Sequence, residues 1–279
     1  MLDFRVVSYG IFSTISFFVF SQASASEIPI PNGPEGQFQL VFSDEFSEQE
    51  LDLRRWTTCY WWVKNGCTNL GNNELEWYVP ENVSVRDGAL RLTAKRENVV
   101  GWKGQIFPYT SGMVTTGRYY EEDPAEVRFE AKEGFFEMRA DLPSGQGLWP
   151  AFWMLPSSRE SKPEIDIMEL LGHRTDVLEL HFHYRNDAGE SRNVGHEVAT
   201  WDLAQGWHTY GVEWSEREIV WYLDGWEVWR YEERERIPNE PMYMIINLAV
   251  GGDWPGDPNS ETKFPAIMKI DYVRAWKRK

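Results

Sequence analysis

Short runs rich in β-branched and aromatic residues, separated by Gly, Pro, Asn and Asp, recur along the chain from residue 37 to the C-terminus. Two runs alternate apolar and polar residues on both sides of an Asp-Gly pair: VSVRDGALRLTAK, residues 83–95, and EIVWYLDGWEVWRY, residues 218–231. Each predicts a β-hairpin. Long helical periodicity, internal repeats and a Gly-rich phosphate loop are absent from the sequence, which excludes helical bundles, solenoids and nucleotide-binding folds. The expected fold is all-β, a jelly-roll sandwich of two antiparallel sheets.

The N-terminal part of the chain has a different composition. Residues 6–20, VVSYGIFSTISFFVF, form an apolar run too short to cross a bilayer comfortably, and Ala23 and Ala25 fit a small-residue cleavage site. We expect residues 1–25 to be a signal peptide, 26–36 a linker and 37–279 one folded domain of a secreted or periplasmic protein. Because Arg5 is the sole positive charge before the run, a membrane tether or another export route stays open.

Charge and cysteine usage restrict the partners. A formal net charge of −16 opposes binding to nucleic acid or to an anionic membrane surface, so a neutral ligand fits better. The two cysteines, Cys59 and Cys67, bracket YWWVKNG, where Asn-Gly favours a turn. In an exported chain we expect a disulfide rather than free thiols. Without nearby paired histidines they do not make a zinc site. The mature protein is expected to be a monomer that does not associate with membranes.

The segment PEIDIMELLG, residues 163–172, places three carboxylates within six positions. In a strand Glu164 and Asp166 share one face, and the isoleucines between and after them point to the other. Simple alternation would turn Glu169 into the core, where an unpaired carboxylate is costly. One extra residue, accommodated as a β-bulge near Ile167, returns Glu169 to the face of the other two. We therefore predict a bulged strand with three carboxylates on one face.

This spacing predicts a reaction. With the bulge, Glu164 and Glu169 lie roughly 13 Å apart at Cα, and side chains leaning together leave about 5 to 6 Å between carboxyl groups. A retaining glycosidase needs about 5 to 5.5 Å. One glutamate would attack the anomeric carbon and the other would protonate the leaving oxygen, while Asp166 would orient the nucleophile and raise the proton affinity of its neighbours. No cofactor is needed for this chemistry.

Two alternatives compete with this interpretation. The carboxylates could line a solvated strand face, or they could bind calcium or magnesium. The 15 tryptophans of the chain favour a sugar ligand, because indole rings stack on the apolar faces of sugars. The tryptophans in polar, turn-rich settings are Trp61, Trp62, Trp102, Trp149 and Trp254. Those of the hairpin region, Trp214, Trp221 and Trp229, are expected in the core.

The motifs together resemble a known family. EIDIME, preceded by LPSGQGLWPAFWMLP and followed by MIINLAVGGDWPG and IDYVRAW, resembles laminarinase-type members of glycoside hydrolase family 16, with the bulged E-x-D-x-x-E motif. The likeness extends over nearly all of residues 38–276. It implies a jelly roll with an open substrate cleft on its concave sheet. It also implies a secreted endo-β-1,3-glucanase that cleaves β-1,3 or mixed β-1,3/1,4 glucan internally with retention.

The resemblance also implies roles for individual residues. Glu164 would be the nucleophile, Asp166 its assistant and Glu169 the acid/base. The substrate-binding residues would be Trp149, Trp153, Trp254, Asn72, Glu74 and His183, the last beside the acidic triad. A structural calcium ion on the convex side would be held by Glu45, Asp271 and the carbonyl of Gly88.

Two departures from the family pattern affect which polysaccharide is expected as the substrate. SSRESKP, residues 157–163, is shorter than the loop that usually leads into the acidic motif, and Met113 stands where an arginine is common. A hydrolase of the same fold acting on lichenan, agarose or xyloglucan is therefore an alternative. A non-catalytic β-glucan-binding module is another, although the intact Glu164 and Glu169 argue against it.

Overall fold

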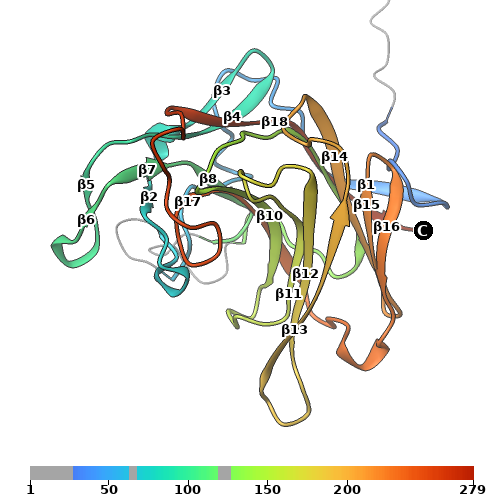
Figure 1. Ribbon diagram of the computed structural model, residues 1–279. Coiled ribbons are helices and arrows are strands. Elements are labelled where there is room, and N and C mark those ends of the chain that lie inside the picture. Colours follow the sequence, from blue (N-terminus) through green and yellow to red (C-terminus); the bar gives the residue numbers. More distant parts are fainter. Residues whose placement is uncertain (1–27, 63–67, 119–126) are drawn as a thin grey trace, which may run out of the picture.

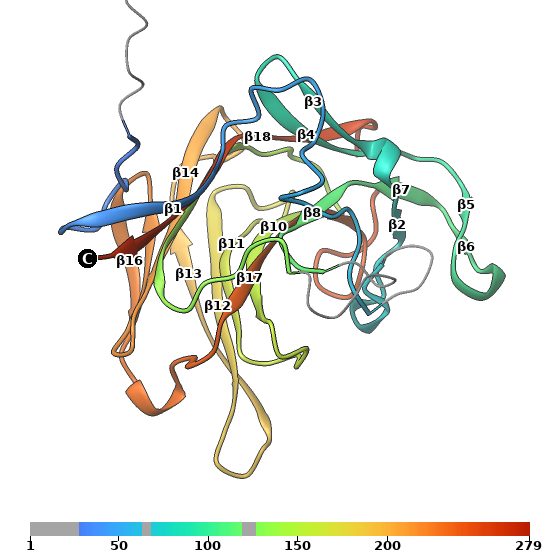
Figure 2. The same cartoon turned by 180° about the vertical axis from the view of Figure 1, so that it is seen from behind.

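The computed structural model describes residues 28–62, 68–118 and 127–279. In this part of the chain, two large antiparallel sheets pack face to face, and helix is confined to short 3₁₀ turns. Figures 1 and 2 show the two layers from opposite sides. The predicted all-β jelly roll is confirmed. The segment predicted as a signal peptide lies outside the described residues.

The convex sheet has eight strands in the order β16-β15-β14-β9-β18-β4-β3, with β1 paired to β18. Their bounds are β1 (Phe38–Asp44), β3 (Val83–Arg86), β4 (Ala89–Ala94), β9 (Gly134–Asp141), β14 (Trp207–Trp214), β15 (Ile219–Leu223), β16 (Trp226–Tyr231) and β18 (Ala266–Arg278).

The concave sheet has six strands in the order β13-β12-β11-β10-β17-β8. Their bounds are β8 (Met113–Thr115), β10 (Leu148–Pro156), β11 (Glu164–Glu169), β12 (Val177–Arg185), β13 (Ser191–Ala199) and β17 (Met242–Val250). The remaining elements are the parallel pair β2 (Glu76–Tyr78) and β7 (Tyr109–Ser111), the pair β5 (Val99–Val100) and β6 (Ile106–Phe107), and the 3₁₀ turns η1 (Leu70–Asn72), η2 (Pro80–Asn82), η3 (Trp102–Gly104) and η4 (Arg234–Arg236). Across residues 28–62, 68–118 and 127–279, no helix has the length and apolar character needed to cross a membrane.

Both predicted hairpins are present. Strands β3 and β4 pair as far as Arg86 and Ala89, and β15 and β16 pair as far as Leu223 and Trp226. Each turn has both central residues at positive φ, 55° and 71° in the first and 48° and 83° in the second. This conformation suits glycine and is tolerated by aspartate, which is why Asp-Gly occupies both turns.

The core lies between the two sheets. From the concave sheet, Ile165 and Ile167 of β11 are fully buried; from the convex sheet, Trp214 and Trp221 are fully buried, and Trp229 stacks on Trp221 with ring centroids 4.2 Å apart. Burial of each such side chain contributes about 1.5 to 3 kcal/mol to folding. Because strand residues alternate between faces, burying the isoleucines of β11 turns its carboxylates away from the core.

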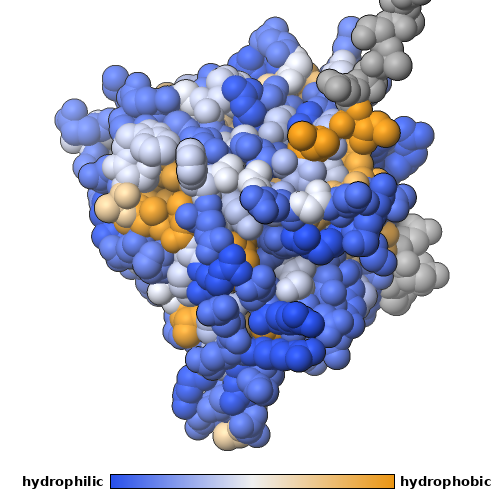
Figure 3. All heavy atoms as spheres, turned by 90° about the vertical axis from the view of Figure 1, so that its right-hand side faces the viewer, coloured by the Kyte–Doolittle hydropathy of each residue, from blue (hydrophilic) through white to orange (hydrophobic). Residues whose placement is uncertain are grey.

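The segment predicted as a linker, 26–36, contacts the convex sheet where it is described. The carbonyl of Pro29 accepts a hydrogen bond from the Trp276 indole at 2.9 Å, and the backbone N–H of Asn32 donates to Glu137 at 3.3 Å. Figure 3 views the side of β15 and β16, which is largely hydrophilic with hydrophobic residues in separate small patches. The domain boundaries themselves stay a prediction.

Candidate active site

Strand β11 contains the extra residue that the sequence predicts. Asp166 pairs with His181 on β12 and Glu169 pairs with Glu179, so three steps along β11 match two steps along β12. A matching register shift occurs in the pairing of β11 with β10. The bulge therefore falls between Asp166 and Glu169, and it returns Glu169 to the face that carries Glu164 and Asp166.

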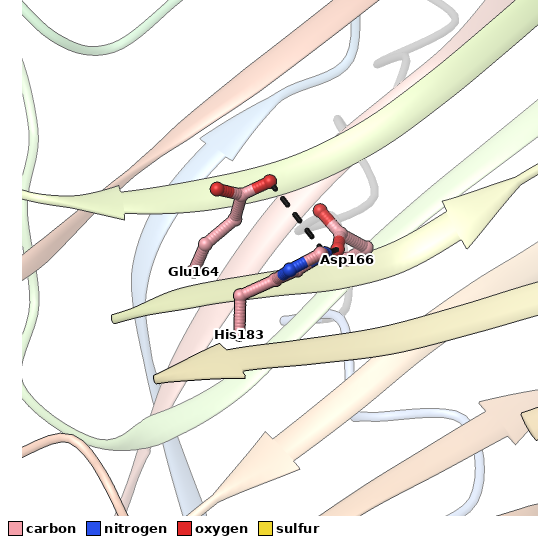
Figure 4. Close-up of side chains that lie close together, drawn as sticks. All are labelled: Glu164, Asp166 and His183. Carbon is pink, nitrogen blue, oxygen red and sulfur yellow. Dashed lines mark ion pairs between the residues drawn. The ribbon is translucent and has the colours of Figure 1, made fainter. Parts of the chain in front are cut away.

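Glu164 lies at the start of β11 between two cationic groups. The Lys162 ammonium donates a hydrogen bond to Oε2 at 2.7 Å, and Nε2 of His183 lies 4.0 Å from Oε1 (Figure 4). Burial, and then the negative charge of Asp166, raise the pKa of Glu164 above its ordinary value, while Lys162 and His183 oppose this. Since Lys162 holds Oε2, Oε1 is the oxygen left to approach a substrate.

Asp166 occupies the centre of the group and is 3% exposed. Its Oδ2 lies 3.1 Å from Nε2 of His183, an ion-pair distance that Figure 4 marks, and its backbone carbonyl accepts a hydrogen bond from the Trp221 indole at 2.9 Å. Burial and the charge of Glu169 raise the pKa of Asp166. Burial lowers the pKa of His183, but the contact with Asp166 outweighs it and the net pKa is raised.

Glu169 has a separate set of partners. The Trp149 indole donates to Oε1 at 3.1 Å, and Nδ1 of His181 lies 2.7 Å from Oε2. Burial lowers the pKa of His181, but the hydrogen bond and charge of Glu169 outweigh it and raise that pKa to about 9. The imidazolium therefore holds a proton next to Glu169 at neutral pH.

The three carboxylates do not form a solvated strand face. Asp166 and Glu169 are buried, at 3% and 8% exposed; Oδ2 of Asp166 lies 3.1 Å from Nε2 of His183, and Glu169 accepts a hydrogen bond from the Trp149 indole. Like charges are crowded in a poorly solvated place, which is costly for stability and typical of a reactive site. That alternative from the sequence is therefore wrong.

An open cleft of about 860 Å³ covers this face of the concave sheet. Every substrate-binding residue predicted from the sequence lines it: Asn72, Glu74, Trp149, Trp153, His183 and Trp254. Trp153 is fixed by a chain of hydrogen bonds, because its indole donates to Asn247 at 2.7 Å and Asn247 donates to Tyr78 at 3.0 Å. Trp61 and Trp62 also line the cleft, whereas Trp102 does not belong to its lining in the described chain.

Three residues of the site were missed by the sequence analysis: Lys162, His181 and Asn247. For His181 a signal existed, since HFHY in a strand places both histidines on the same face as their β11 neighbours. Lys162 and Asn247 carried no comparable signal, because their roles arise from contacts with segments that the motif does not include.

Two clusters of donors in the described chain are close enough to hold a metal ion, Glu164–Asp166–His183 and Asp166–Glu169–His181. Each includes an imidazole, which calcium and magnesium do not favour. The predicted calcium set does not fit as arranged. Glu45 pairs with Arg274 at 2.6 Å and Asp271 with Arg139 at 2.7 Å, so guanidinium groups neutralise both carboxylates. Gly88 lies in the β3–β4 turn.

The predicted disulfide involves Cys67, which lies outside the described residues. Cys59 is buried in a small hydrophobic cluster that also contains Tyr60, Tyr78, Met113, Leu155, Tyr243 and Ile245. The pairing of the two cysteines stays a prediction.

Comparisons with known proteins agree with this geometry. The model of the family "Glycosyl hydrolases family 16" matches residues 72–274. The chain is 35% identical to the endo-1,3-1,4-beta-glycanase EglC of Rhizobium meliloti (strain 1021), over 93% of this chain and 57% of that protein. It is 33% identical to a beta-glucanase of Rhodothermus marinus, over 86% of this chain and 85% of that protein.

Among solved structures, the laminarinase catalytic domain of Thermotoga maritima MSB8 matches with a TM-score of 0.74 and 36% identity, over 88% of this chain and 100% of that chain. The endo-beta-1,3-glucanase of Pyrococcus furiosus matches with a TM-score of 0.73 and 32% identity, over 90% and 99%. The chain spans about half the length of the first curated relatives that it matches, 57% and 51%.

Proposed function

The chain belongs to glycosyl hydrolase family 16, and from this premise we propose that it is an endo-acting, retaining β-glucanase that hydrolyses β-1,3-glucan or mixed β-1,3/1,4-glucan. One observation carries the proposal. The bulge in β11 brings Glu164 and Glu169 onto one face, with Asp166 between them, at the floor of an open cleft lined by tryptophans. This is the arrangement that a double displacement at an anomeric carbon requires.

In the first step Glu164 attacks the anomeric carbon and the bond from that carbon to the glycosidic oxygen breaks. Glu169 gives the leaving oxygen its proton, and a glycosyl ester on Glu164 results. In the second step Glu169 takes a proton from water, the water oxygen bonds to the anomeric carbon, and Glu164 is released. The configuration is retained because the carbon is inverted twice.

The surrounding residues fit these roles. Lys162 and His183 place positive charge beside Glu164, which favours the ionised nucleophile over the neutral acid. Nδ1 of His181 and the Trp149 indole fix both oxygens of Glu169, and the hydrogen bond from His181 keeps a proton within reach of it. The charge of Asp166, between the two glutamates, helps to raise the pKa of His181 and so opposes loss of the imidazolium proton.

The relatives support a glucan as substrate. Their printed names include endo-1,3-1,4-beta-glycanase and glucan endo-1,3-beta-glucosidase, and an open cleft suits internal cleavage of a polymer. Residues such as Trp149, Trp153 and Trp254 offer stacking surfaces for glucose rings. No cofactor takes part in the proposed steps.

Release of reducing sugar from laminarin, lichenan, agarose and carboxymethylcellulose tests the proposal. We expect hydrolysis of laminarin and lichenan and none of the other two. Hydrolysis of agarose alone would show that agarose, and not β-glucan, is the substrate, and would leave the proposed mechanism unchanged. Binding of laminarin with no hydrolysis of any polymer would favour the binding module instead.

Export through cleavage after Ala25 is part of the proposal, supported by the apolar run and the Ala-x-Ala site. N-terminal sequencing of protein recovered outside the cell should begin near Ser26. An intact chain in the membrane fraction would contradict it.

A further inference from the structure

Two tryptophans at one end of the sandwich are unusually exposed. Trp201 follows β13 and is 54% exposed, and Trp226 opens β16 and is 76% exposed. Most tryptophans of the described chain are buried or line the cleft, whereas these two exposed indoles lie on neighbouring segments, and exposed apolar surface gathered in one place marks an interaction site. Neither residue belongs to the cleft lining of the described chain.

The two tryptophans flank one polar pair. The Trp201 ring packs on the ring of His208 with centroids 5.8 Å apart, and Nδ1 of His208 lies 2.7 Å from Asp224. Asp224 stands in the β15–β16 turn, two residues before Trp226. We call these four residues, Trp201, His208, Asp224 and Trp226, the rim patch.

Strand pairing places the patch on one side of the convex sheet. Trp226 pairs with Leu223, and Leu223 pairs with Tyr210. Directly paired residues project to the same side of a sheet, and His208, two residues before Tyr210, shares that side. Leu223 and Tyr210 are covered by the core, whereas Trp226 lies beyond the end of the covered region. The apolar face of these strands therefore extends beyond the core, and its last residue, Trp226, is exposed to solvent.

The same combination of groups occurs in the cleft. There the Trp254 ring packs on His181 with centroids 5.5 Å apart, and His181 lies 2.7 Å from Glu169. In both places a carboxylate fixes a histidine and the histidine supports an exposed indole. Such an indole offers a flat apolar surface beside polar groups, which is the chemistry that recognises a sugar ring.

We propose that the rim patch is a second, non-catalytic binding site for the β-glucan polymer; the identity of that polymer rests on the proposed function. A neutral polysaccharide suits the patch because the chain carries a net charge of −16, which repels anionic polymers. Asp224 is held by Nδ1 of His208 at 2.7 Å and by the Thr209 backbone N–H at 2.7 Å, so its carboxylate is engaged within the patch.

The patch is close enough to the cleft for one polymer chain to use both. Glu197 of β13 lines the cleft and Trp201 lies four residues further along the chain, at most about 13 Å away between Cα atoms in extended backbone. Once the cleft holds a glucan, the patch binds the same chain at a high effective concentration. The patch would therefore strengthen binding of long glucans and leave short oligosaccharides unaffected.

The test measures polymer binding in the full chain with the reaction blocked by Glu164→Gln. Migration through native gels containing increasing laminarin gives an apparent Kd. Adding Trp201→Ala and Trp226→Ala to this background should raise the apparent Kd about fivefold or more. Trp102→Ala is the matched control, since Trp102 is also exposed, at 43%, but belongs to neither site.

The active enzyme carrying Trp201→Ala and Trp226→Ala should hydrolyse laminaritetraose with the kcat/KM of the unmodified protein and lose efficiency on laminarin. Any of three results would overturn the proposal that the rim patch binds glucan. They are an unchanged apparent Kd, an equal loss of laminarin affinity in the Trp102→Ala control, and an equal loss of kcat/KM on the tetrasaccharide. Absence of tetrasaccharide and laminarin hydrolysis by the unmodified enzyme would instead overturn the proposed function, while the gel comparison would still decide whether the patch binds glucan.

Discussion

Each of the two sheets buries carboxylates, and the two groups differ in what surrounds them. On the convex sheet, Glu137 is 1% exposed and accepts hydrogen bonds from the Tyr272 hydroxyl at 2.9 Å and the Asn32 backbone N–H at 3.3 Å. On the concave sheet, Glu164, Asp166 and Glu169 lie together beneath an open cleft. Burial is common to both, so burial by itself does not mark a functional site.

The difference lies in charge and access. Glu137 is a single carboxyl satisfied by two neutral donors and covered by the segment that contains Asn32. The β11 group places like charges against each other and offsets them with histidines and a lysine. Repulsion of this kind is tolerated when it prepares groups for chemistry. The comparison therefore separates a structural carboxyl from the carboxyls that we propose to be catalytic, and it can be tested.

The largest effect is expected for Glu164→Gln. Loss of the nucleophile should reduce laminarin hydrolysis by about 10⁴-fold or more, with little change in the thermal midpoint of unfolding. Glu137→Gln, the matched change on the other sheet, should leave kcat within about twofold. Comparable losses of activity in the two variants would show that the buried carboxylates of the two sheets do not differ in function.

A smaller loss is expected for His181→Gln, because His181 positions Glu169 and supplies its hydrogen bond. We expect kcat to fall about 10- to 100-fold. With the His181 pKa raised to about 9, the rate of the unmodified enzyme should decline as pH rises through that value, since the pair loses its proton there. This alkaline decline should be absent from the variant's pH profile; an unaltered profile would show that His181 is merely structural.

A modest effect is expected for Trp254→Ala, which removes a stacking surface in the cleft without touching the acids. KM for laminarin should rise about three- to tenfold with kcat nearly unchanged. Steady-state kinetics on laminarin and on laminaritetraose will show this. A fall in kcat alone would place Trp254 in the reaction rather than in binding.

The smallest effect on activity, and a specific one on stability, is expected for Glu137. Burial raises its pKa to about 7, opposed by the Tyr272 hydrogen bond. A carboxyl whose folded pKa is raised favours the folded state below its unfolded pKa near 4.5, and that contribution is lost as pH rises through about 7. The free energy of unfolding should therefore fall by up to about 3 kcal/mol between pH 4.5 and 8 from this group.

Urea unfolding of Glu137→Gln at several pH values checks this. The variant lacks the titration, so its stability relative to the unmodified protein should improve as pH rises from 5 to 8. A difference that does not depend on pH would show that Glu137 titrates normally.

Much of the fold followed from the sequence because its signals are local. Asp-Gly turns, alternation in β3, β4, β15 and β16, and the extra residue in EIDIME each act over a few residues. The shared face of Glu164, Asp166 and Glu169 could be predicted for the same reason. In contrast, His181 and Lys162 have roles fixed by pairing of β11 with other segments, and a single sequence does not display those contacts.

The expected calcium site depends on contacts between segments that are distant in the sequence. Glu45 and Asp271 have the right chemistry, but arginines of β18 and β9, Arg274 and Arg139, occupy both carboxylates in the folded chain. Which cation satisfies a surface carboxylate depends on strand neighbours across the sheet. The calcium site, which only the family resemblance implied, stays a prediction.

The central claim is that Glu164 is the nucleophile and Glu169 the acid/base, and azide rescue of the two alanine variants tests it most directly. With an aryl β-glucoside that has a good leaving group, Glu169→Ala still forms the glycosyl ester, and azide should attack it to give the β-glycosyl azide. In Glu164→Ala no ester can form, so azide entering the vacated space should give the α product. Proton NMR of the anomeric signal distinguishes the two products. The account predicts β from Glu169→Ala and α from Glu164→Ala; a β-azide from Glu164→Ala would reverse the two roles and contradict it.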